Sequence, residues 1–255
     1  NLYDVTPASD APADVDAARR LDGQQNRWYL DPVLKGSYPA DVVADHARFT
    51  DMDFVQDGDL ETISARLDWL GINYYNDHLY APRTTSTPGV SAHVTAPDSG
   101  PMVVDRPTTD IGWPITPQGF EGLLVRLRDD YGAALPPIYI TENGGAFPDH
   151  LSDGVVHDAD RTRYLAQHIA AVGAALAQGV PMAGYMVWSL MDNFEWASGY
   201  VKRAAHLLPR QGKSGHWQVA HNYKTDTALL RDAPIADEGL EFRRVTKSSS
   251  DIKAR

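Results

Sequence analysis

Short apolar segments alternate with longer amphipathic segments through most of this chain of 255 residues. Runs rich in β-branched and aromatic residues are typical of buried strands, whereas apolar residues spaced about three or four positions apart indicate helices. Strands that alternate with helices form parallel sheets, because each helix returns the chain to the same end of the sheet. The sequence therefore predicts an α/β fold. The predicted strands are residues 1–3, 71–75, 138–141 and 182–190, and the predicted helices are residues 14–30, 40–49, 60–70, 116–131 and 158–178.

The strand predicted at residues 138–141 ends at a carboxylate, Glu142, which is followed by Asn-Gly-Gly. In barrels of alternating strands and helices, residues at the C-terminal ends of the strands face the active-site mouth. An ionised carboxylate at that place can attack the anomeric carbon of a sugar. A glutamate that only caps a loop is the simpler alternative, because such positions are common on α/β folds.

Aromatic and acidic side chains gather where the strand predicted at residues 182–190 ends. Trp188, Glu195 and Trp196 all lie within the sequence Trp-Ser-Leu-Met-Asp-Asn-Phe-Glu-Trp. Flat indole rings cover the C–H face of a sugar, while carboxylates and amides bind its hydroxyl groups. This second segment therefore favours a carbohydrate ligand.

Composition excludes several other classes of function. The net charge of −11 argues against a nucleic-acid partner, because phosphate binding requires a basic surface. The chain has no cysteine, and its nine histidines show no metal-ligand spacing, so we expect no metal site and no cofactor. No apolar run reaches the roughly 18 residues of a membrane span, and no signal segment is visible, which predicts a cytoplasmic protein without membrane contact.

Three motifs resemble a known family. They are Gly-Ile-Asn-Tyr-Tyr at residues 71–75, Tyr-Ile-Thr-Glu-Asn-Gly at residues 139–144, and the tryptophan-containing motif at residues 188–196. Together, in this order, they resemble glycoside hydrolase family 1, the β-glucosidase family. The resemblance implies a TIM-type (β/α)8 barrel. Residues 1–203 are similar to only about its second half, with four parallel strands, so the N-terminus is expected to be truncated.

Residues 204–255 do not share this resemblance. Beyond Arg203 the chain is polar, basic and almost without periodicity, with 11 Lys and Arg against 6 Asp and Glu in residues 201–255. We predict an atypical and poorly ordered tail. Divergence or an altered reading frame near residue 203 would explain it.

The resemblance also implies roles for individual residues. Glu142 would be the nucleophile of a retaining β-glycosidase, and Tyr75 would donate a hydrogen bond to it. The other implied contacts are to the substrate, a small β-glycoside or oligosaccharide. Asn73 would line the sugar site, Trp113 would offer a platform to the leaving group, Trp188 would stack beneath the ring, and Glu195 and Trp196 would bind hydroxyl groups.

Half of the expected machinery is missing from the sequence. Retaining glycosidases need a second carboxyl group as acid and base, which the family carries in an Asn-Glu-Pro motif, and this chain has no such tripeptide. We therefore predict that the chain alone is weakly active or inactive. A half barrel would also leave strand edges unpaired, which predicts self-association. The alternatives are a carbohydrate-binding remnant without catalysis and a structural half barrel that binds no sugar.

Overall fold

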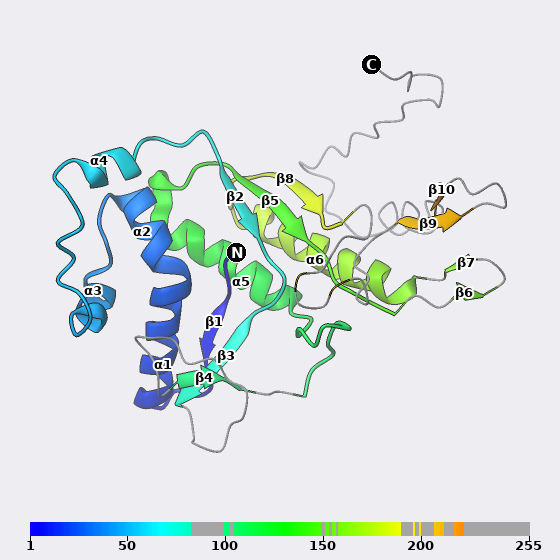
Figure 1. Cartoon of the computed structure of the whole chain (residues 1–255), viewed down its shortest axis with the longest axis horizontal. Coiled ribbons are helices and arrows are strands. Elements are labelled where there is room, and N and C mark those ends of the chain that lie inside the picture. Colours follow the sequence, from blue (N-terminus) through cyan, green and yellow to red (C-terminus); the bar gives the residue numbers. More distant parts are fainter. Residues whose placement is uncertain are drawn as a thin grey trace.

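The computed structural model describes most of the first 189 residues (Figure 1). The described parts are residues 1–82, 99–102, 105–148, 151–152, 155–156 and 158–189, the single residues 196 and 199, and the backbone of residues 207–211 and 217–221. The strands are β1 (Val5–Pro7), β2 (Leu70–Asn73), β3 (His78–Pro82), β4 (Ser99–Pro101), β5 (Ile138–Asn143), β6 (Leu151–Ser152), β7 (Val155–Val156), β8 (Met182–Val187), β9 (Leu207–Gln211) and β10 (Trp217–His221). The α-helices are α1 (Pro12–Asp22), α2 (Trp28–Lys35), α3 (Ala40–His46), α4 (Asp59–Ile63), α5 (Pro117–Tyr131) and α6 (Ala159–Ala177).

The central sheet is parallel and has the order β2-β5-β8 (Figure 1). Helix α5 connects β2 to β5, and helix α6 connects β5 to β8, so the chain forms the βαβ units that the sequence predicts. The fourth predicted strand, residues 1–3, joins this sheet through one backbone bond, from Leu2 N–H to the Asn73 carbonyl at 3.1 Å. The first regular strand begins later than predicted. It is β1, which pairs in parallel with β3 outside the central sheet.

The core lies between this sheet and the two helices α5 and α6. Along β5 the side chains alternate, so that Ile138 and Ile140 are fully buried while Tyr139 and Thr141 on the opposite face are only half-buried. The buried face packs against the apolar stripe of α5, which consists of Phe120, Leu123, Leu124 and Leu127. The opposite face of the sheet corresponds to the interior of a barrel.

The two helices that support the sheet have the ends that the sequence predicts. Helix α5 begins with Thr116 at the N-cap and a proline in its first turn, where a missing N–H costs nothing. Helix α6 begins after Asp158 at the N-cap. Gly179, with a φ of 88°, follows its last turn in the left-handed conformation that glycine favours.

The prediction that the first helix ends at residue 30 is wrong. The chain remains helical from α1 through a π-helical turn, Gly23–Arg27, into α2, which contains Pro32. The missing amide of Pro32 falls close to the place where the hydrogen-bond register changes from π to α, so little regular bonding is lost there. The helix ends instead at Gly36, which has a φ of 67°.

The helix predicted at residues 60–70 is also much shorter in the structure. Helix α4 covers only Asp59–Ile63, with Gly58 at the N-cap position. None of the residues of α4 is buried in the described structure, and Leu67 and Trp69 beyond it are exposed. A short helix that buries none of its residues is only marginally stable, which explains its early end.

The C-terminal segment is described only in part. Strands β9 and β10 form an antiparallel pair within residues 204–255. The rest of the predicted tail lies outside the described residues. Of the helices in the described part of the chain, none combines the length and the apolar character needed to cross a membrane.

Candidate active site

Glu142 lies near the carboxyl end of β5, beside the end of β2. The hydroxyl of Tyr75 donates a hydrogen bond to its Oε2 atom at 2.6 Å. These two residues are 67 positions apart in the chain, and the pairing of β2 with β5 brings them together. The carboxylate therefore has a neutral donor next to it at the end of the sheet where barrel enzymes carry their chemistry.

An irregularity in the pairing of β2 and β5 sets the position of Glu142. Ile72 pairs with Ile140, but Asn73 pairs with Glu142, so β5 has one extra residue at this point. The Tyr74 N–H then bonds the Glu142 carbonyl at 3.0 Å. Such bulges re-aim a side chain next to a site, and here the bulge directly precedes the Tyr75–Glu142 contact.

Asn73 lies next to this pair, at the last position of β2. Its Oδ1 atom accepts a hydrogen bond from the Thr141 hydroxyl at 2.6 Å. This bond fixes the rotation of the amide and turns the oxygen toward β5. Asn73 is therefore held in place at the mouth of the sheet, where its amide can face a ligand.

Trp113 forms a wall beside Tyr75. The two ring centroids are 5.2 Å apart, and the ring planes are inclined by 54°. Two bonds with Thr109 close the loop that carries the indole: the Thr109 N–H donates to the Trp113 carbonyl at 2.8 Å, and the Trp113 N–H donates to Thr109 Oγ1 at 3.3 Å. The aromatic surface is thus attached to a closed turn.

Trp188 directly follows β8, and its N–H donates to the Asn143 carbonyl at 2.9 Å. Its indole is half-buried, whereas Trp196 has 83% of its surface exposed. Glu195, the remaining predicted substrate contact, lies outside the described residues. The structure therefore brings Glu142, Tyr75, Asn73 and Trp113 together, and it attaches the backbone of Trp188 to the same strand end.

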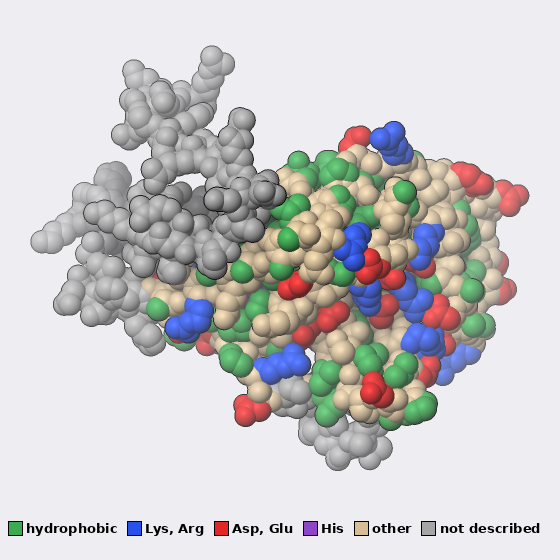
Figure 2. Space-filling view, turned by 180° about the vertical axis from the view of Figure 1, so that it is seen from behind, with side chains coloured by type: hydrophobic (Ala, Val, Ile, Leu, Met, Phe, Trp, Pro, Cys, Tyr) green, Lys and Arg blue, Asp and Glu red, His purple; other side chains and the backbone are tan. Residues whose placement is uncertain are grey.

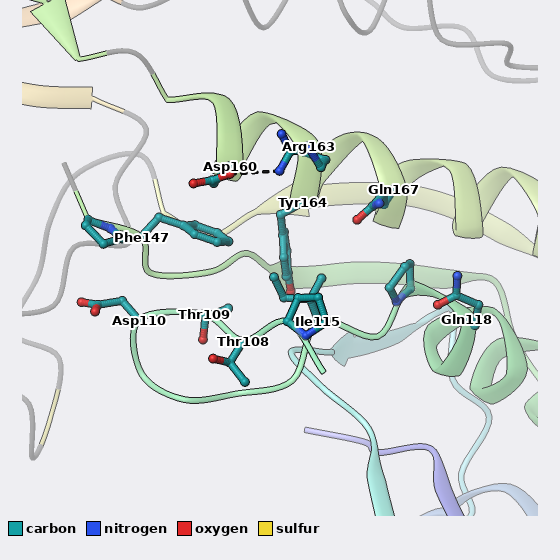
Figure 3. A pocket seen from close by; sticks show the side chains of 13 residues that line it. Thr108, Thr109, Asp110, Ile115, Gln118, Phe147, Asp160, Arg163, Tyr164 and Gln167 are labelled. Atoms are coloured by element: carbon teal, nitrogen blue, oxygen red, sulfur yellow. Dashed lines mark hydrogen bonds and ion pairs between the residues drawn. The ribbon is translucent and has the colours of Figure 1, made fainter. Parts of the chain in front are cut away.

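The structure also has a separate cavity of about 620 Å³ (Figure 3). It is bounded by the loop that contains Thr108 and Thr109, by Phe147, and by the start of α6. Tyr164 lines this cavity, and its hydroxyl reaches the strand ends on the other side through a bond to Asn143. Glu142 and Tyr75 do not line it, so it is not the sugar site that the sequence predicts.

Comparison with known proteins decides the family. The profile of "Glycosyl hydrolase family 1" matches residues 1–206. The chain belongs to glycosyl hydrolase family 1. It is 42% identical over 205 residues to a bifunctional β-D-glucosidase/β-D-fucosidase from Bifidobacterium breve, covering 74% of this chain and 43% of that protein. It is also 42% identical over 203 residues to a β-glucosidase from an Agrobacterium species, covering 80% of this chain and 42% of that protein.

Solved structures of family 1 enzymes confirm the fold class. A psychrophilic β-glucosidase from Micrococcus antarcticus is 38% identical and superposes with a TM-score of 0.80, covering 91% of this chain and 52% of that chain. A family 1 β-glucosidase from Thermotoga maritima, solved with isofagomine lactam, gives a TM-score of 0.72 at 33% identity, covering 86% of this chain and 46% of that chain. The fold of this family 1 chain is therefore a partial (β/α) barrel.

The chain spans less than half the length of these curated relatives.

The sequence patterns do not identify three residues that meet at the strand end next to Glu142. The motif at residues 139–144 contains Asn143, the helical pattern of α6 contains Tyr164 and the apolar run of β8 contains Tyr185, but none of these patterns assigns them a role at the site. Alternation along β8 and the helical stripe of α6 indicate that these tyrosines point inward, but not that their hydroxyl groups meet.

Proposed function

We propose that this chain carries the nucleophile side of a retaining β-glycosidase site, with Glu142 as the attacking group. The observation that supports this most directly is the hydrogen bond from the Tyr75 hydroxyl to the Glu142 carboxylate at the mouth of a partial family 1 barrel. A neutral donor orients the carboxylate without neutralising its charge. Hydrogen bonds to charged groups contribute about 1.5–3 kcal/mol, which is enough to select one orientation of the side chain.

In the proposed reaction a Glu142 oxygen forms a bond to the anomeric carbon of a terminal β-D-glycosyl residue. The bond to the leaving oxygen breaks, and that oxygen takes the electron pair and a proton from an acid. Water then attacks the same carbon and gives a proton to the conjugate base of that acid. The bond to Glu142 breaks, the carboxylate takes back its electron pair, and the sugar is released with its original configuration. The relatives named β-glucosidase, and the β-D-fucosidase activity named for one of them, support a β-D-glucoside or a closely similar sugar as the substrate class.

The acid that protonates the leaving oxygen is not supplied by a recognisable motif in this chain. A general acid contributes about 10²–10⁴-fold to the rate. We therefore propose that the isolated chain hydrolyses ordinary glycosides weakly or not at all. A leaving group that departs as a stable anion, such as 2,4-dinitrophenolate, needs little proton assistance and makes the first step accessible without the acid.

Labelling with 2,4-dinitrophenyl 2-deoxy-2-fluoro-β-D-glucoside tests this proposal. The fluorine slows hydrolysis of the glycosyl–enzyme, so the intact chain is expected to gain one fluoroglucosyl group, and peptide mapping is expected to place it on Glu142. Glu142→Gln is expected to abolish labelling. Glu121→Gln is the matched control, because Glu121 lies on α5 and bonds the exposed Gln178 side chain, away from the strand ends. Labelling elsewhere, or none, would refute the assignment.

A carbohydrate-binding remnant without catalysis is the second candidate, and the missing acid motif favours it. In that case tryptophan fluorescence is expected to change on titration with a β-glucoside while the fluorinated reagent leaves Glu142 unlabelled. If the fluorescence is unchanged and there is no label, the chain is a structural half barrel that binds no sugar. The two measurements together separate all three functions.

We further propose that the chain associates through the free edge of its sheet. Within the described residues β8 pairs only with β5, and Met186 and Val187 on β8 are 48% and 38% exposed. An exposed apolar edge strand is a template for pairing with another chain. Sedimentation velocity is expected to show concentration-dependent oligomers, and Met186→Lys is expected to reduce them. A monomer at all concentrations would contradict this proposal.

A further inference from the structure

Asn143, which directly follows Glu142, is fully buried, with 0% of its surface exposed. Its Nδ2 atom donates to the Tyr74 carbonyl at 2.7 Å and to the Tyr164 hydroxyl at 3.2 Å. Its Oδ1 atom accepts from the Tyr185 hydroxyl at 2.5 Å. One amide therefore connects the chain just beyond β2, helix α6 and strand β8, and both of its donors and its acceptor are used.

These bonds hold the backbone on both sides of the Tyr75–Glu142 contact. The Tyr74 carbonyl, which precedes Tyr75, accepts from Asn143, and the Tyr75 carbonyl accepts from the Tyr164 hydroxyl at 3.3 Å. On the other strand, the Glu142 carbonyl accepts from the Tyr74 N–H. The peptide groups that carry the donor and the acceptor are therefore tied to one another through Asn143 and Tyr164.

The aromatic side chains around this network are closely packed. The Tyr164 ring stacks on His168, with ring centroids 3.9 Å apart, and Tyr74 stacks on Phe120 at 4.3 Å. Burial raises the pKa of the Tyr164 and Tyr185 hydroxyls, so both stay protonated and able to donate. Hydrogen bonds are stronger where water cannot compete, and an unsatisfied group there is costly. A single geometry is therefore favoured.

We infer that Asn143 is a positioning residue that, together with Tyr164 and Tyr185, fixes the alignment of Glu142 with the Tyr75 hydroxyl. The inference goes beyond the proposed function by naming the groups that aim the carboxylate. It rests on that function only where Glu142 is called the nucleophile. A purely structural role predicts a loss of stability on substitution, whereas a positioning role also predicts that the Tyr75–Glu142 contact itself is lost.

Fluorine NMR of the full chain with 3-fluorotyrosine at position 75 measures that contact without requiring any reaction. The resonance in the unaltered chain defines the bonded state, and Glu142→Ala defines the unbonded state. Asn143→Asp keeps the shape and the acceptor but removes both N–H donors. It is expected to move the resonance to the unbonded position, and Asn143→Ala is expected to do the same. Tyr164→Phe and Tyr185→Phe each remove one bond and are expected to shift it part of the way.

Tyr131→Phe is the matched control. The Tyr131 hydroxyl is also buried and donates to Asp31 at 2.7 Å, and Tyr131 is the last residue of α5, which contributes no residue to the network around Asn143. Its loss is expected to cost stability comparable to that of the other tyrosine variants but to leave the fluorine resonance unchanged. This control separates general destabilisation from loss of alignment.

The rate of labelling by the fluorinated glucoside gives a second readout. A displacement of about 1 Å can cost on the order of 10²-fold in rate, so Asn143→Asp is expected to lower the maximal labelling rate about 10–100-fold with a smaller effect on the half-saturating concentration. Each tyrosine variant is expected to lower the rate roughly 5-fold, the equivalent of one ordinary hydrogen bond. Tyr131→Phe is expected to label like the unaltered chain.

The outcomes distinguish the two proposals. A bonded fluorine resonance in a folded Asn143→Asp chain overturns the positioning role, whatever the labelling shows. If Asn143→Asp does not fold, the test passes to Tyr164→Phe and Tyr185→Phe, and an unshifted resonance in both overturns it equally. If the unaltered chain is never labelled but the resonance responds as expected, the proposed function fails and the positioning role stands.

Discussion

Gly144 should tolerate no side chain, because the backbone of Trp188 approaches it closely. An ideal Cβ atom at Gly144 would lie 1.8 Å from the Trp188 carbonyl oxygen and 2.9 Å from its carbonyl carbon. Both atoms belong to the backbone, so no rotation of a side chain can relieve the contact. We therefore expect Gly144→Ala to push β5 and β8 apart at their carboxyl ends.

The structure sets the size of this effect. Contacts of a Cβ atom below 3.0 Å are essentially never observed, so the 1.8 Å approach must open by at least 3.0 − 1.8 = 1.2 Å. A shift of this size breaks the bond from Trp188 N–H to the Asn143 carbonyl, now 2.9 Å. Overpacking costs about 1–3 kcal/mol, and the lost hydrogen bond about 1 kcal/mol. A total of about 3 kcal/mol lowers the Tm by roughly 6–12 °C for a chain of this size.

Gly173→Ala is the matched control for this substitution. Gly173 lies inside α6, and a Cβ atom there would meet nothing within 4 Å. Alanine is favoured over glycine in a helix interior by about 0.5–1 kcal/mol, so the Tm is expected to rise by roughly 1–4 °C. Thermal unfolding followed by circular dichroism compares the two variants. In the labelling assay, Gly144→Ala is expected to react about 10²-fold more slowly and Gly173→Ala at the unaltered rate.

An unchanged Tm and labelling rate in Gly144→Ala would refute this reasoning. It would mean that the ends of β5 and β8 can separate at little cost, so that their close approach does not fix the site. Equal destabilisation in Gly173→Ala would also contradict it, since the cost would then not arise from the contact with Trp188.

Three further predictions concern buried and charged groups. Burial lowers the pKa of His168 to about 4 from the ordinary histidine value of 6.5, so the unfolded chain binds the proton first as the pH falls. The free energy of unfolding, measured by urea titration, is therefore expected to drop by about 2 kcal/mol between pH 6.5 and pH 5. His168→Phe should flatten that dependence. Arg161, which is 1% exposed, pairs with Asp158 and donates to the Phe147 carbonyl. Arg161→Met is therefore expected to lower the free energy of unfolding by about 3–5 kcal/mol. The same substitution at the exposed Arg163 should change it by less than about 0.5 kcal/mol. Tyr75→Phe removes the donor to Glu142 and is expected to slow labelling about 10–100-fold without a comparable loss of Tm.

The order of the motifs was sufficient to predict the family and the fold class. The runs around Ile72, Ile140 and Tyr185 are short, apolar and separated by helical patterns, and each became a strand of one parallel sheet. Local patterns were less successful where packing decides the outcome. The helix predicted at residues 60–70 has a suitable apolar spacing, but the part that forms, α4, buries none of its residues. Pro32 ends a helix only if the hydrogen-bond register around it is regular.

The sequence by itself determined which residues form strands and which chemical groups stand at their ends, because both depend on side-chain type and on spacing within a few residues. Only the tertiary structure decided how those groups meet. The extra residue in β5 just before Glu142 and the shared amide of Asn143 depend on strands and a helix that are distant in the chain. Their geometry arises from packing and from the need to satisfy every buried polar group, and neither is encoded in any single segment.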